Sequence, residues 1–356
     1  MVGAGYFAQF HLDAWQRLER EGAVELVAVC DADESRGKQA CRQFGARRSF
    51  QTAAAMLDAI DCDLLDIATP PATHAGLVAQ AVERGLAAIC QKPVAPTLQE
   101  AEEIARLATD SSKPVFVHEN FRWMPWYVEM RRQIGAGTLG RIHSLAVRMR
   151  PGDGQGPNAY LTRQPYFQQM PRFLVHETLV HYIDTLRFLL GPMVAVTARL
   201  RRVNPAIMGE DAGYVIVEFA SGATGLIDAN RLNDHPAANP RLTMGEVWLE
   251  GANGVLRLDG DANLHLKPHS QSEKPHNYAW ADIGFGGDCV YAQQAHVLRH
   301  LQHGEPAVNL VADYLLNVWI EEAIYRSAAL GRTILLPAVT PLPAATIAPA
   351  TFTCKL

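Results

Sequence analysis

A glycine-rich motif at the very start of the chain constrains the fold more than any other feature. Its residues are Gly3-Ala4-Gly5-Tyr6-Phe7-Ala8, a G-x-G-x-x-A pattern. Such a pattern has weight only where it opens a helix inside a strand–helix–strand unit. Here apolar residues at helical spacing continue to about residue 20, and a short β-branched run, residues 24–30, comes next. This context predicts the phosphate-binding turn of a dinucleotide-binding domain.

Each small residue of the motif has its own task in such a turn. Gly3 allows the tight turn, Gly5 lets the main chain approach a pyrophosphate, and Ala8 permits close packing of helix against strand. Free N–H groups and the helix dipole receive the phosphate charge. We therefore expect Gly3 and Gly5, with their neighbours Tyr6 and Phe7, to bind the cofactor.

The choice of cofactor depends on two residues, Asp31 and Arg36, that follow the next apolar run. Asp31 ends that run and could accept hydrogen bonds from both ribose hydroxyls, whereas its carboxylate would repel a 2′-phosphate. Arg36 lies just beyond and could instead receive that phosphate. The sequence therefore favours NAD as the cofactor and leaves NADP open.

The first strand is unusually short. Only Met1 and Val2 precede Gly3, whereas a strand normally runs about five residues. Either the numbering begins at an internal methionine of a longer natural chain, or the central strand is cut short. No charged segment followed by an apolar one, as in a secretion leader, is seen in these residues.

Length and composition restrict the classes of protein that this chain can belong to. A chain of 356 residues that is 48% hydrophobic has enough apolar material for two cores, so we expect two domains. A net charge of −5 provides no basic surface for nucleic acid, and no uncharged run approaches the roughly 18 residues of a membrane helix. The six cysteines form no C-x-x-C pair, so we expect reduced core thiols and a cytoplasmic protein.

Up to about residue 118, short apolar runs alternate with helical patterns. The apolar runs are residues 64–68, 87–90 and 115–117, and the helical patterns are residues 73–84 and 97–108. Thr97 and Glu100 have the spacing of a capping box. Alternation of this kind predicts a doubly wound parallel sheet, which we assign to a domain of residues 1–121.

The pattern then changes to successive strands. They are residues 142–149, 194–202, 214–219, 223–229, 242–249, 254–258 and 263–266, with turns such as Asp259-Gly260-Asp261 between them. Helices over residues 172–190 and 289–303 are expected to pack on this sheet, and a helix over 310–330 closes the fold. The pattern predicts an α+β domain, residues 122–337, with a large, open, mainly antiparallel sheet. Residues 338–356 have little periodicity and are expected to form a mobile tail.

So few helices leave one face of such a sheet uncovered. A large apolar face is rarely left in water, so we expect the chain to form a homodimer or a homotetramer. The long segments of residues 151–170 and 233–240 are candidates for substrate contacts.

Further motifs follow in a fixed order along the chain. They are Ala68-Thr69-Pro70-Pro71-Ala72-Thr73-His74, Gln91-Lys92-Pro93, Asn120-Phe121-Arg122-Trp123 and Glu177-Thr178-Leu179-Val180-His181-Tyr182-Ile183-Asp184. With the glycine motif and Asp31, they resemble the Gfo/Idh/MocA family of glucose-fructose, inositol and rhizopine oxidoreductases over nearly all of residues 1–337. The resemblance implies an amino-terminal Rossmann domain, a carboxy-terminal open sheet and NAD(P)-dependent redox chemistry on hydroxyl groups of sugars, cyclitols or related compounds.

The resemblance also implies catalytic residues. The family's E-K-P motif becomes Gln91-Lys92-Pro93, in which Lys92 would reach the reacting hydroxyl and the nicotinamide ribose while Gln91 keeps the hydrogen-bonding shape without the charge. The D-x-G-x-H motif maps onto residues 177–181, with Glu177 for aspartate and Leu179 for glycine. His181 is suited to accept the hydroxyl proton, and Glu177, four residues earlier on a helix, can orient it.

Two other chemistries fit the sequence poorly. His176 and His181 are five residues apart, which is not the spacing of an H-E-x-x-H zinc site, so we expect no metal. No G-x-S-x-G elbow of a serine hydrolase occurs.

The remaining candidate site residues are expected to bind either the substrate or the cofactor. Those expected to bind a polyhydroxylated substrate, or to be structural ion-pair partners instead, are Arg122, Trp123, Tyr160, Arg163, Tyr166, Arg172 and His176. Those expected by resemblance to line the dinucleotide are Thr69, Pro70, His74, Gln91, Lys92 and Asn120. Asp184 could serve structure or chemistry.

The sequence thus predicts an NAD(P)-dependent dehydrogenase of a sugar or polyol. Residues 89–93 and 117–123 look most similar to family members that act on pentose-type sugars such as apiose. One alternative is an NAD-dependent glycosidase of the same family, which product analysis would distinguish. Another is a non-catalytic regulator that senses dinucleotide or sugar, but retention of Lys92 and His181 argues against it.

Overall fold

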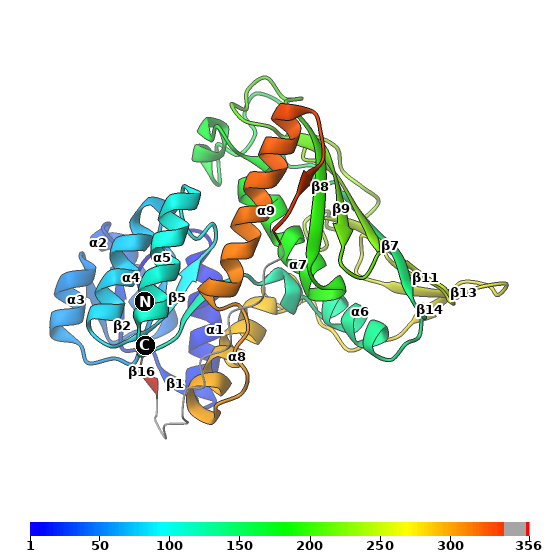
Figure 1. Ribbon diagram of the computed structural model, residues 1–356. Coiled ribbons are helices and arrows are strands. Elements are labelled where there is room, and N and C mark those ends of the chain that lie inside the picture. The colour runs from blue at the N-terminus through cyan, green and yellow to red at the C-terminus, as the bar shows by residue number, and fades with distance from the viewer. Residues whose placement is uncertain (338–353, 356) are drawn as a thin grey trace. The chain divides into compact units, whose positions relative to one another are not determined.

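The computed structural model describes residues 1–337 and 354–355, which form two compact units (Figure 1). The first unit contains Met1–Asn120 and Val290–Val318, together with residues 354–355. The second contains Phe121–Cys289 and the residues from Trp319 to the end of the first described range. Among the described helices, none has both the length and the apolar character needed to span a membrane.

A parallel sheet organises the first unit. Its strands are β2 (Ala28–Cys30), β3 (Arg48–Phe50), β4 (Leu64–Ile67), β5 (Ala87–Gln91) and β6 (Val115–His118). Val2 lies between the two halves and bridges to Cys30 and Ile67 in parallel. Its N–H donates to the carbonyl oxygen of Asp66 at 2.8 Å. The central strand of this doubly wound sheet is therefore very short.

Helices flank this sheet. They are α1 (Ala8–Arg20), α2 (Glu34–Phe44), α3 (Ala53–Ala59), α4 (His74–Glu83), α5 (Leu98–Asp110) and the single turn η1 (Pro71–Thr73). The predicted capping box is present, because the Thr97 hydroxyl accepts from the Glu100 N–H at 3.2 Å and donates to the Glu100 carboxylate at 2.8 Å. Caps of this kind typically stabilise a helix by about 1 kcal/mol. The short strand β1 (Val24–Glu25) pairs in parallel with β16 (Cys354–Lys355), and the rest of the expected tail lies outside the described residues.

One helix belongs to a different unit from the one expected. Most of α8 (Cys289–His303) is part of the first unit, although the sequence predicted that it packs on the second sheet. Val297 and Leu298 of α8 are buried in the same core cluster as Leu12 and Trp15 of α1. Apolar spacing shows that a helix has a buried face but does not identify the surface that covers it.

A nine-stranded sheet dominates the second unit, in the order β14–β13–β12–β11–β7–β10–β9–β8–β15. The strands are β7 (Ile142–Met149), β8 (Met193–Arg201), β9 (Ala212–Phe219), β10 (Thr224–Asn230), β11 (Gly245–Gly251), β12 (Gly254–Leu258), β13 (Leu264–Pro268), β14 (Lys274–His276) and β15 (Ile334–Leu335). Only the pairing of β7 with β10 is parallel within this described sheet. The mainly antiparallel sheet predicted from the sequence is confirmed, and the very short β14 and β15 were not predicted.

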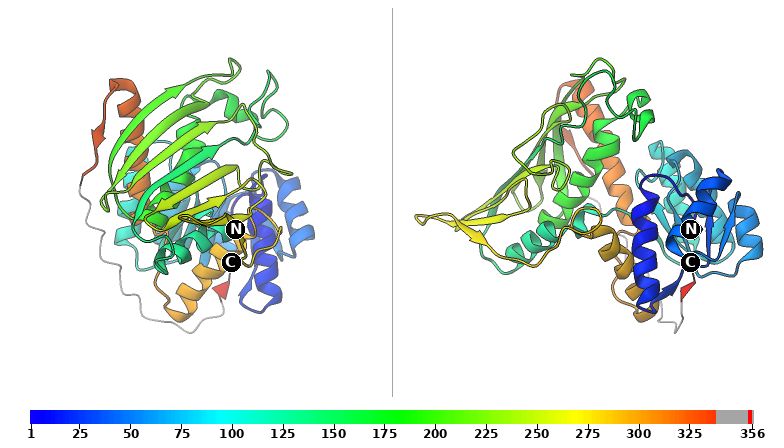
Figure 2. Two further views of the ribbon diagram at one scale, coloured as in Figure 1. Left: turned by 90° about the vertical axis from the view of Figure 1, so that its right-hand side faces the viewer. Right: turned by 180° about the vertical axis from the view of Figure 1, so that it is seen from behind.

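Helices lie on one face of this sheet. They are η2 (Phe121–Trp123), α6 (Pro125–Gly135), η3 (Pro165–Gln169), the π-helix η4 (Leu174–Leu179), α7 (Val180–Leu190) and the final part of α9 (Val311–Leu330). A Cβ built on Gly225 of β10 would lie 3.3 Å from the Leu186 side chain of α7, so helix and sheet are in close contact. The left view of Figure 2 looks onto the other face, where strands are in front and helices behind.

The other face carries an apolar row that runs across neighbouring strands. Ile216 of β9 pairs with Leu226 of β10, Leu226 with Ala146 of β7, and Ala146 with Trp248 of β11. Ile216, Leu226 and Trp248 are 44%, 37% and 43% exposed. Arg257 of β12 continues the row and lies over the Trp248 ring, 5.5 Å from its centroid.

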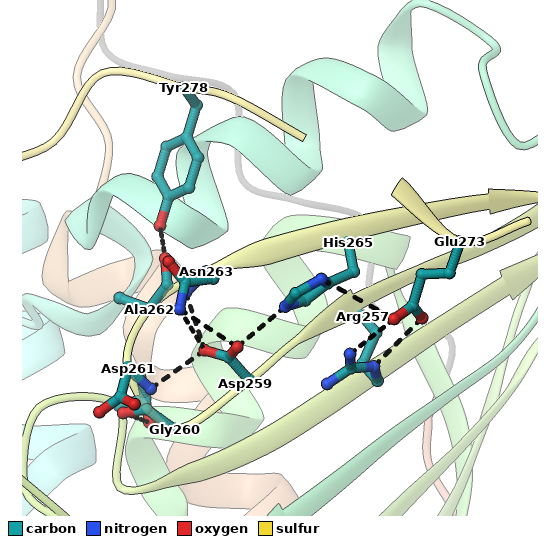
Figure 3. Close-up of polar contacts among 10 residues, drawn as sticks. Arg257, Asp259, Gly260, Asp261, Ala262, Asn263, His265, Glu273 and Tyr278 are labelled. Atoms are coloured by element: carbon teal, nitrogen blue, oxygen red, sulfur yellow. Dashed lines mark hydrogen bonds and ion pairs between the residues drawn. The ribbon is translucent and has the colours of Figure 1, made fainter. Parts of the chain in front are cut away.

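Side-chain contacts fix the turn between β12 and β13 (Figure 3). The Asp259 carboxylate accepts from the N–H groups of Asp261 at 3.0 Å and Asn263 at 2.9 Å, and it also contacts His265 at 2.8 Å. Aspartate commonly folds its own turn in this way. The predicted turn at Asp259-Gly260-Asp261 is therefore present.

Candidate active site

The glycine motif forms a turn between the central strand and α1. Gly3 has a φ of +99°, and a Cβ there would lie 2.4 Å from the Ala68 carbonyl oxygen, so only glycine fits. A Cβ on Gly5 would meet no atom within 4 Å, which leaves open space beside the main chain. The N-cap residue Phe7 offers no side-chain acceptor to the first turn of α1. An open main chain at a helix start without a side-chain cap fits the pyrophosphate of a dinucleotide.

Asp31 is held firmly at the end of β2. Its Oδ2 accepts from the Ala4 N–H at 2.8 Å, and its Oδ1 accepts from the Asp33 N–H at 2.9 Å. Each carboxylate oxygen retains capacity for a further hydrogen bond, so the residue can still accept ribose hydroxyls. The exposed Arg36 pairs instead with Asp33, with 3.4 Å between Nε and Oδ2.

Lys92 follows β5, at the carboxyl end of the parallel sheet. The peptide bond between Lys92 and Pro93 is cis. The neighbouring Gln91 side chain is directed into the unit: its Oε1 accepts from the Lys92 N–H at 2.7 Å, and its Nε2 lies 3.0 Å from His11 Nε2. Ligands of open α/β sheets bind at this end of the strands.

His74 holds two loops together at the same edge. It is fully buried, with Nε2 at 2.8 Å from the Thr69 carbonyl oxygen and Nδ1 at 3.1 Å from that of Val94. Burial lowers the pKa of His74. A neutral ring carries one N–H, so it donates to one of these two carbonyl oxygens at a time. This arrangement favours a structural role, in which His74 positions the Thr69 loop.

The other predicted cofactor residues differ in exposure. Tyr6 is 47% exposed, Pro70 is exposed and Asn120 is buried. Phe7 packs edge-on against His11, with 5.7 Å between ring centroids. Of these four residues, Tyr6 and Pro70 are exposed, Phe7 is half-buried and Asn120 is buried.

In the second unit, the ring of His181, a residue of α7, lies against η2. Its ring is stacked on Phe121 of η2, with centroids 3.9 Å apart and an interplanar angle of 2°. Next to it, Arg122 donates to both oxygens of Asp184 at 2.6 and 2.5 Å, and Asp184 is almost fully buried. A fork of two charge-assisted hydrogen bonds is a strong and directional contact. Arg122 and Asp184 thus fasten η2 to α7 and fix the position of the His181 ring.

The segment before His181 is not the regular helix that we expected. Leu174–Leu179 is a π-helix, and α7 begins only at Val180. The α-helical spacing argument for Glu177 and His181 therefore does not apply as stated. Burial and the nearby Glu177 carboxylate raise the pKa of Tyr166 to about 12, which places Glu177 close to the long loop. Single π-turns inside helices often occur at functional sites.

A buried cluster that the sequence did not predict joins this loop to the sheet. Arg231, 3% exposed, donates to Asp153 at 2.8 Å and to the Tyr160 hydroxyl at 2.9 Å, and also contacts the Thr178 hydroxyl. Arg163 donates to the same carboxylate at 3.1 Å. Burial acts to raise the pKa of Asp153, but the arginines outweigh it and hold that pKa below the usual value.

The remaining substrate candidates also have partners within the second unit. His176 lies 2.6 Å from a Glu321 oxygen of α9, and Arg172 pairs with Glu322. Tyr166 is 55% exposed and accepts from Gln164 at 3.1 Å, whereas Trp123 is half-buried in η2. Tyr160 and Arg163 are thus brought together, and Arg172 and His176 lie along α9.

Sequence reasoning missed two pairs of functional interest. Asp66 interrupts a buried apolar run, and a charged residue at such a position requires a partner, which is a signal that could have been used. Its partner His11 lies on the apolar side of α1. Arg231 directly follows β10, but nothing in the sequence pairs it with Asp153.

Comparisons with known proteins agree with this architecture. Residues 1–119 match the family described as "Oxidoreductase family, NAD-binding Rossmann fold", and residues 127–257 match the "GFO/IDH/MocA C-terminal domain". The chain is 34% identical over 355 residues to D-apiose dehydrogenase of Paraburkholderia graminis, covering 96% of this chain and 92% of that protein. It is 31% identical to D-apiose dehydrogenase of Rhizobium rhizogenes, covering 94% and 96%.

Solved structures show the same fold. An oxidoreductase from Agrobacterium radiobacter, in complex with NAD+, L-tartaric acid and magnesium, has a TM-score of 0.83 at 30% identity over 94% of this chain and 96% of that one. Levoglucosan dehydrogenase with NADH and levoglucosan has a TM-score of 0.81 at 22% identity over 95% and 98%, which supports the fold alone. Because two family models and relatives above 30% identity cover most of the chain, it belongs to the Gfo/Idh/MocA family of oxidoreductases with an NAD-binding Rossmann fold.

Proposed function

We propose that this protein oxidises a hydroxyl group of a pentose-type sugar such as D-apiose and uses NAD rather than NADP. The observation that carries the choice of cofactor is the Asp31 carboxylate, held by the N–H groups of Ala4 and Asp33. A fixed carboxylate at the end of the second strand accepts ribose hydroxyls and repels a 2′-phosphate. The substrate class is supported by the two D-apiose dehydrogenases that align along nearly their whole length.

The proposed roles follow from the chemistry of the side chains. NAD, when bound, would supply the hydride acceptor. We assign to His181 the acceptance of the hydroxyl proton, because a neutral imidazole is a suitable base near pH 7. Lys92 binds and orients the hydroxyl oxygen through its ammonium group. For Glu177 we propose an orienting role toward His181 that rests on the family motif of residues 177–181 and not on α-helical spacing.

The test is a spectrophotometric assay for NADH formation with a panel of sugars. D-apiose, other pentoses, hexoses, myo-inositol and levoglucosan are each offered with NAD and then with NADP. We expect net NADH formation with a pentose-type sugar. Better turnover with NADP would contradict the role of Asp31, and no reduction with any sugar would contradict the dehydrogenase assignment.

His181→Ala tests the assignment of the base. Loss of a general base typically lowers turnover by roughly 10²–10⁴-fold, while NAD affinity, measured by fluorescence titration, should change little. The matched control is His143→Ala, because His143 is an exposed histidine of β7 to which no part in the site is assigned, and this change should affect turnover far less. Near-normal turnover in His181→Ala would contradict the assigned role.

We also propose self-association through the open face of the nine-stranded sheet. The row Ile216–Leu226–Ala146–Trp248 is apolar and its three large side chains are exposed, and such a face is usually covered in an oligomer. Light scattering should give the mass of a dimer or tetramer, and Leu226→Glu should reduce it. A single-chain mass at micromolar concentration would count against the proposal.

A further inference from the structure

A chain of buried polar groups lies behind the strand end that carries Lys92. Gln91 is 8% exposed, and His11 and Asp66 are fully buried. The Lys92 N–H donates to Gln91 Oε1, and Gln91 Nε2 lies 3.0 Å from His11 Nε2. On the far side of the ring, His11 Nδ1 lies 2.9 and 3.1 Å from the two oxygens of Asp66. A continuous path of hydrogen bonds thus joins the main chain of Lys92 to a buried carboxylate.

The direction of each hydrogen bond follows from the Lys92 end. A main-chain N–H can only donate, so the amide atom beside it must be the oxygen of Gln91. The amide nitrogen of Gln91 then faces His11, and it too can only donate. His11 Nε2 must therefore be unprotonated, which leaves the ring proton on Nδ1, facing Asp66. The contacts require a neutral His11 with its proton on Nδ1.

The Asp66 end leads to the same assignment. Trp15 Nε1 donates to Asp66 Oδ2 at 2.6 Å. Both Asp66 oxygens face His11 Nδ1, and Oδ2 also faces an indole N–H that can only donate, so this carboxyl group acts as an acceptor. The proton of the contact between His11 and Asp66 therefore lies on Nδ1.

Other titratable groups face this cluster. The His118 ring lies 3.9 Å from the His11 ring, between centroids. Burial raises the pKa of the Cys90 thiol, so Cys90 is uncharged near neutrality. Burial also lowers the pKa of the Met1 amino group, which donates to the Ala28 carbonyl oxygen at 2.9 Å.

We propose that Gln91 selects the neutral, Nδ1-protonated form of His11, and that the path Gln91–His11–Asp66 positions Lys92. A glutamate at position 91 would present an oxygen to His11 Nε2, and the ring would need a second proton to donate to it. The cluster would carry one net negative charge in either case, because the added carboxylate is balanced by that proton. The role of the path in positioning Lys92 rests on the proposed function; the protonation state of His11 does not.

The first experiment reads the tautomer directly. Histidine is labelled with ¹⁵N in the full-length protein, and His11 is assigned through its backbone resonances. At pH 7 we expect the shift of a protonated Nδ1 and of an unprotonated Nε2. A ring protonated on Nε2, or on both nitrogens, would overturn the proposal whatever the activity of the enzyme.

The second experiment uses Gln91→Glu and Gln91→Leu. In Gln91→Glu we expect both nitrogens of His11 to be protonated at pH 7, and an unchanged neutral ring would overturn the proposal. Gln91→Leu removes both contacts of the amide, so Lys92 loses its support and kcat should fall roughly 10–100-fold with little change in KM. An unchanged kcat in Gln91→Leu would overturn the positioning role. If Gln91→Glu fails to fold, the spectrum of the unmodified protein still decides the tautomer.

The matched control is Trp15→Phe. It removes a hydrogen bond to the same Asp66 carboxylate, but it lies outside the path to Lys92. We expect Trp15→Phe to lower the melting temperature. The His11 tautomer and kcat should both stay unchanged. A fall in kcat equal to that of Gln91→Leu would show general destabilisation instead and would overturn the positioning role. If no sugar is oxidised, the proposed function fails, while the two spectra still test the protonation of His11.

Discussion

Two aspartates, the fully buried Asp66 of the first unit and the partly buried Asp153 of the second, are stabilised by different kinds of partner. Asp66 in the parallel sheet accepts from the imidazole of His11 and the indole of Trp15. Asp153 in the second unit accepts instead from the guanidinium groups of Arg231 and Arg163. The first carboxylate is thus held by neutral donors and the second by positive charges. Neutral donors suffice where a strand already fixes the backbone, whereas the long loop around Asp153 depends on ion pairs for its order.

The two arrangements should respond differently to loss of the carboxylate charge. Around Asp153, the almost fully buried Arg231 would remain charged without its partner. Around Asp66, only uncharged N–H groups would lose an acceptor. An uncompensated buried charge costs about 3–5 kcal/mol, and an unsatisfied neutral group about 1–3 kcal/mol. The same Asp→Asn change at both positions therefore tests the comparison directly.

The largest expected effect is that of Asp153→Asn. We expect the free energy of unfolding, measured by urea denaturation, to fall by about 3–5 kcal/mol, because Arg231 is left as an unpaired buried charge. Tyr160 and Thr178 remain as hydrogen-bond partners of Arg231 and limit the loss. A loss below that of Asp66→Asn would contradict the ionic description of this cluster.

Asp66→Asn should have a smaller effect. An asparagine keeps the shape and can place its one oxygen where Oδ2 accepts from both His11 and Trp15, but its amide nitrogen then lies beside His11 Nδ1 and the carboxylate charge is lost. We expect a loss of about 1–3 kcal/mol by the same measurement. A loss greater than that of Asp153→Asn would show that the His11 ring is charged after all.

Lowering the pH should remove the stabilisation that the carboxylates of Asp66 and Asp153 give to the folded protein. The pKa of each carboxyl group is lowered in the folded state from its ordinary value of 3.8. Each group therefore stabilises the protein fully above about pH 4, and this stabilisation is lost as the pH falls through the folded-state pKa. The stability difference between each Asn variant and the unmodified protein should shrink steadily below pH 4. A constant difference down to pH 2.5 would contradict the lowered pKa values.

The smallest effects are expected from single donors. Trp15→Phe removes one neutral hydrogen bond and should cost about 1 kcal/mol. Arg163→Gln removes a partner of Asp153 that is more exposed than Arg231 and should cost no more than about 1 kcal/mol, because Arg231 still neutralises the carboxylate. Thermal unfolding, followed by circular dichroism, compares the two variants. A larger loss of stability in Arg163→Gln than in Trp15→Phe would show that Arg231 is not the main partner of Asp153.

Much of the fold could be predicted from local sequence signals. The bounds expected for β7 and β12, residues 142–149 and 254–258, are those observed. Alternation along a half-buried strand is a strong local pattern, and Thr97 with Glu100 marks a helix start in the same local way. The motif residues Gly3 and Gly5 likewise have the conformation and the open space that the turn requires.

The candidate site was predictable only in part. Arg122 was expected either to contact substrate or to be a structural ion-pair partner, and it pairs with Asp184. The regular helix expected before His181 is a π-helix. Helical spacing cannot reveal a single wider turn, because the apolar pattern is nearly the same. The assignment of α8 to the first unit was also beyond the sequence, since many surfaces can cover an apolar helix face.

The sequence by itself determined the dinucleotide fold, the order of the two sheets and the positions of Lys92 and His181 in their motifs. These depend on residues that are close neighbours in the chain. Tertiary structure alone decided the contacts of the buried polar groups. His11 lies 55 residues from Asp66 and 80 from Gln91, and Asp153 lies 78 from Arg231. Only the folded chain brings such distant residues within hydrogen-bond distance, and burial then makes each contact obligatory because an unpaired polar group there is costly.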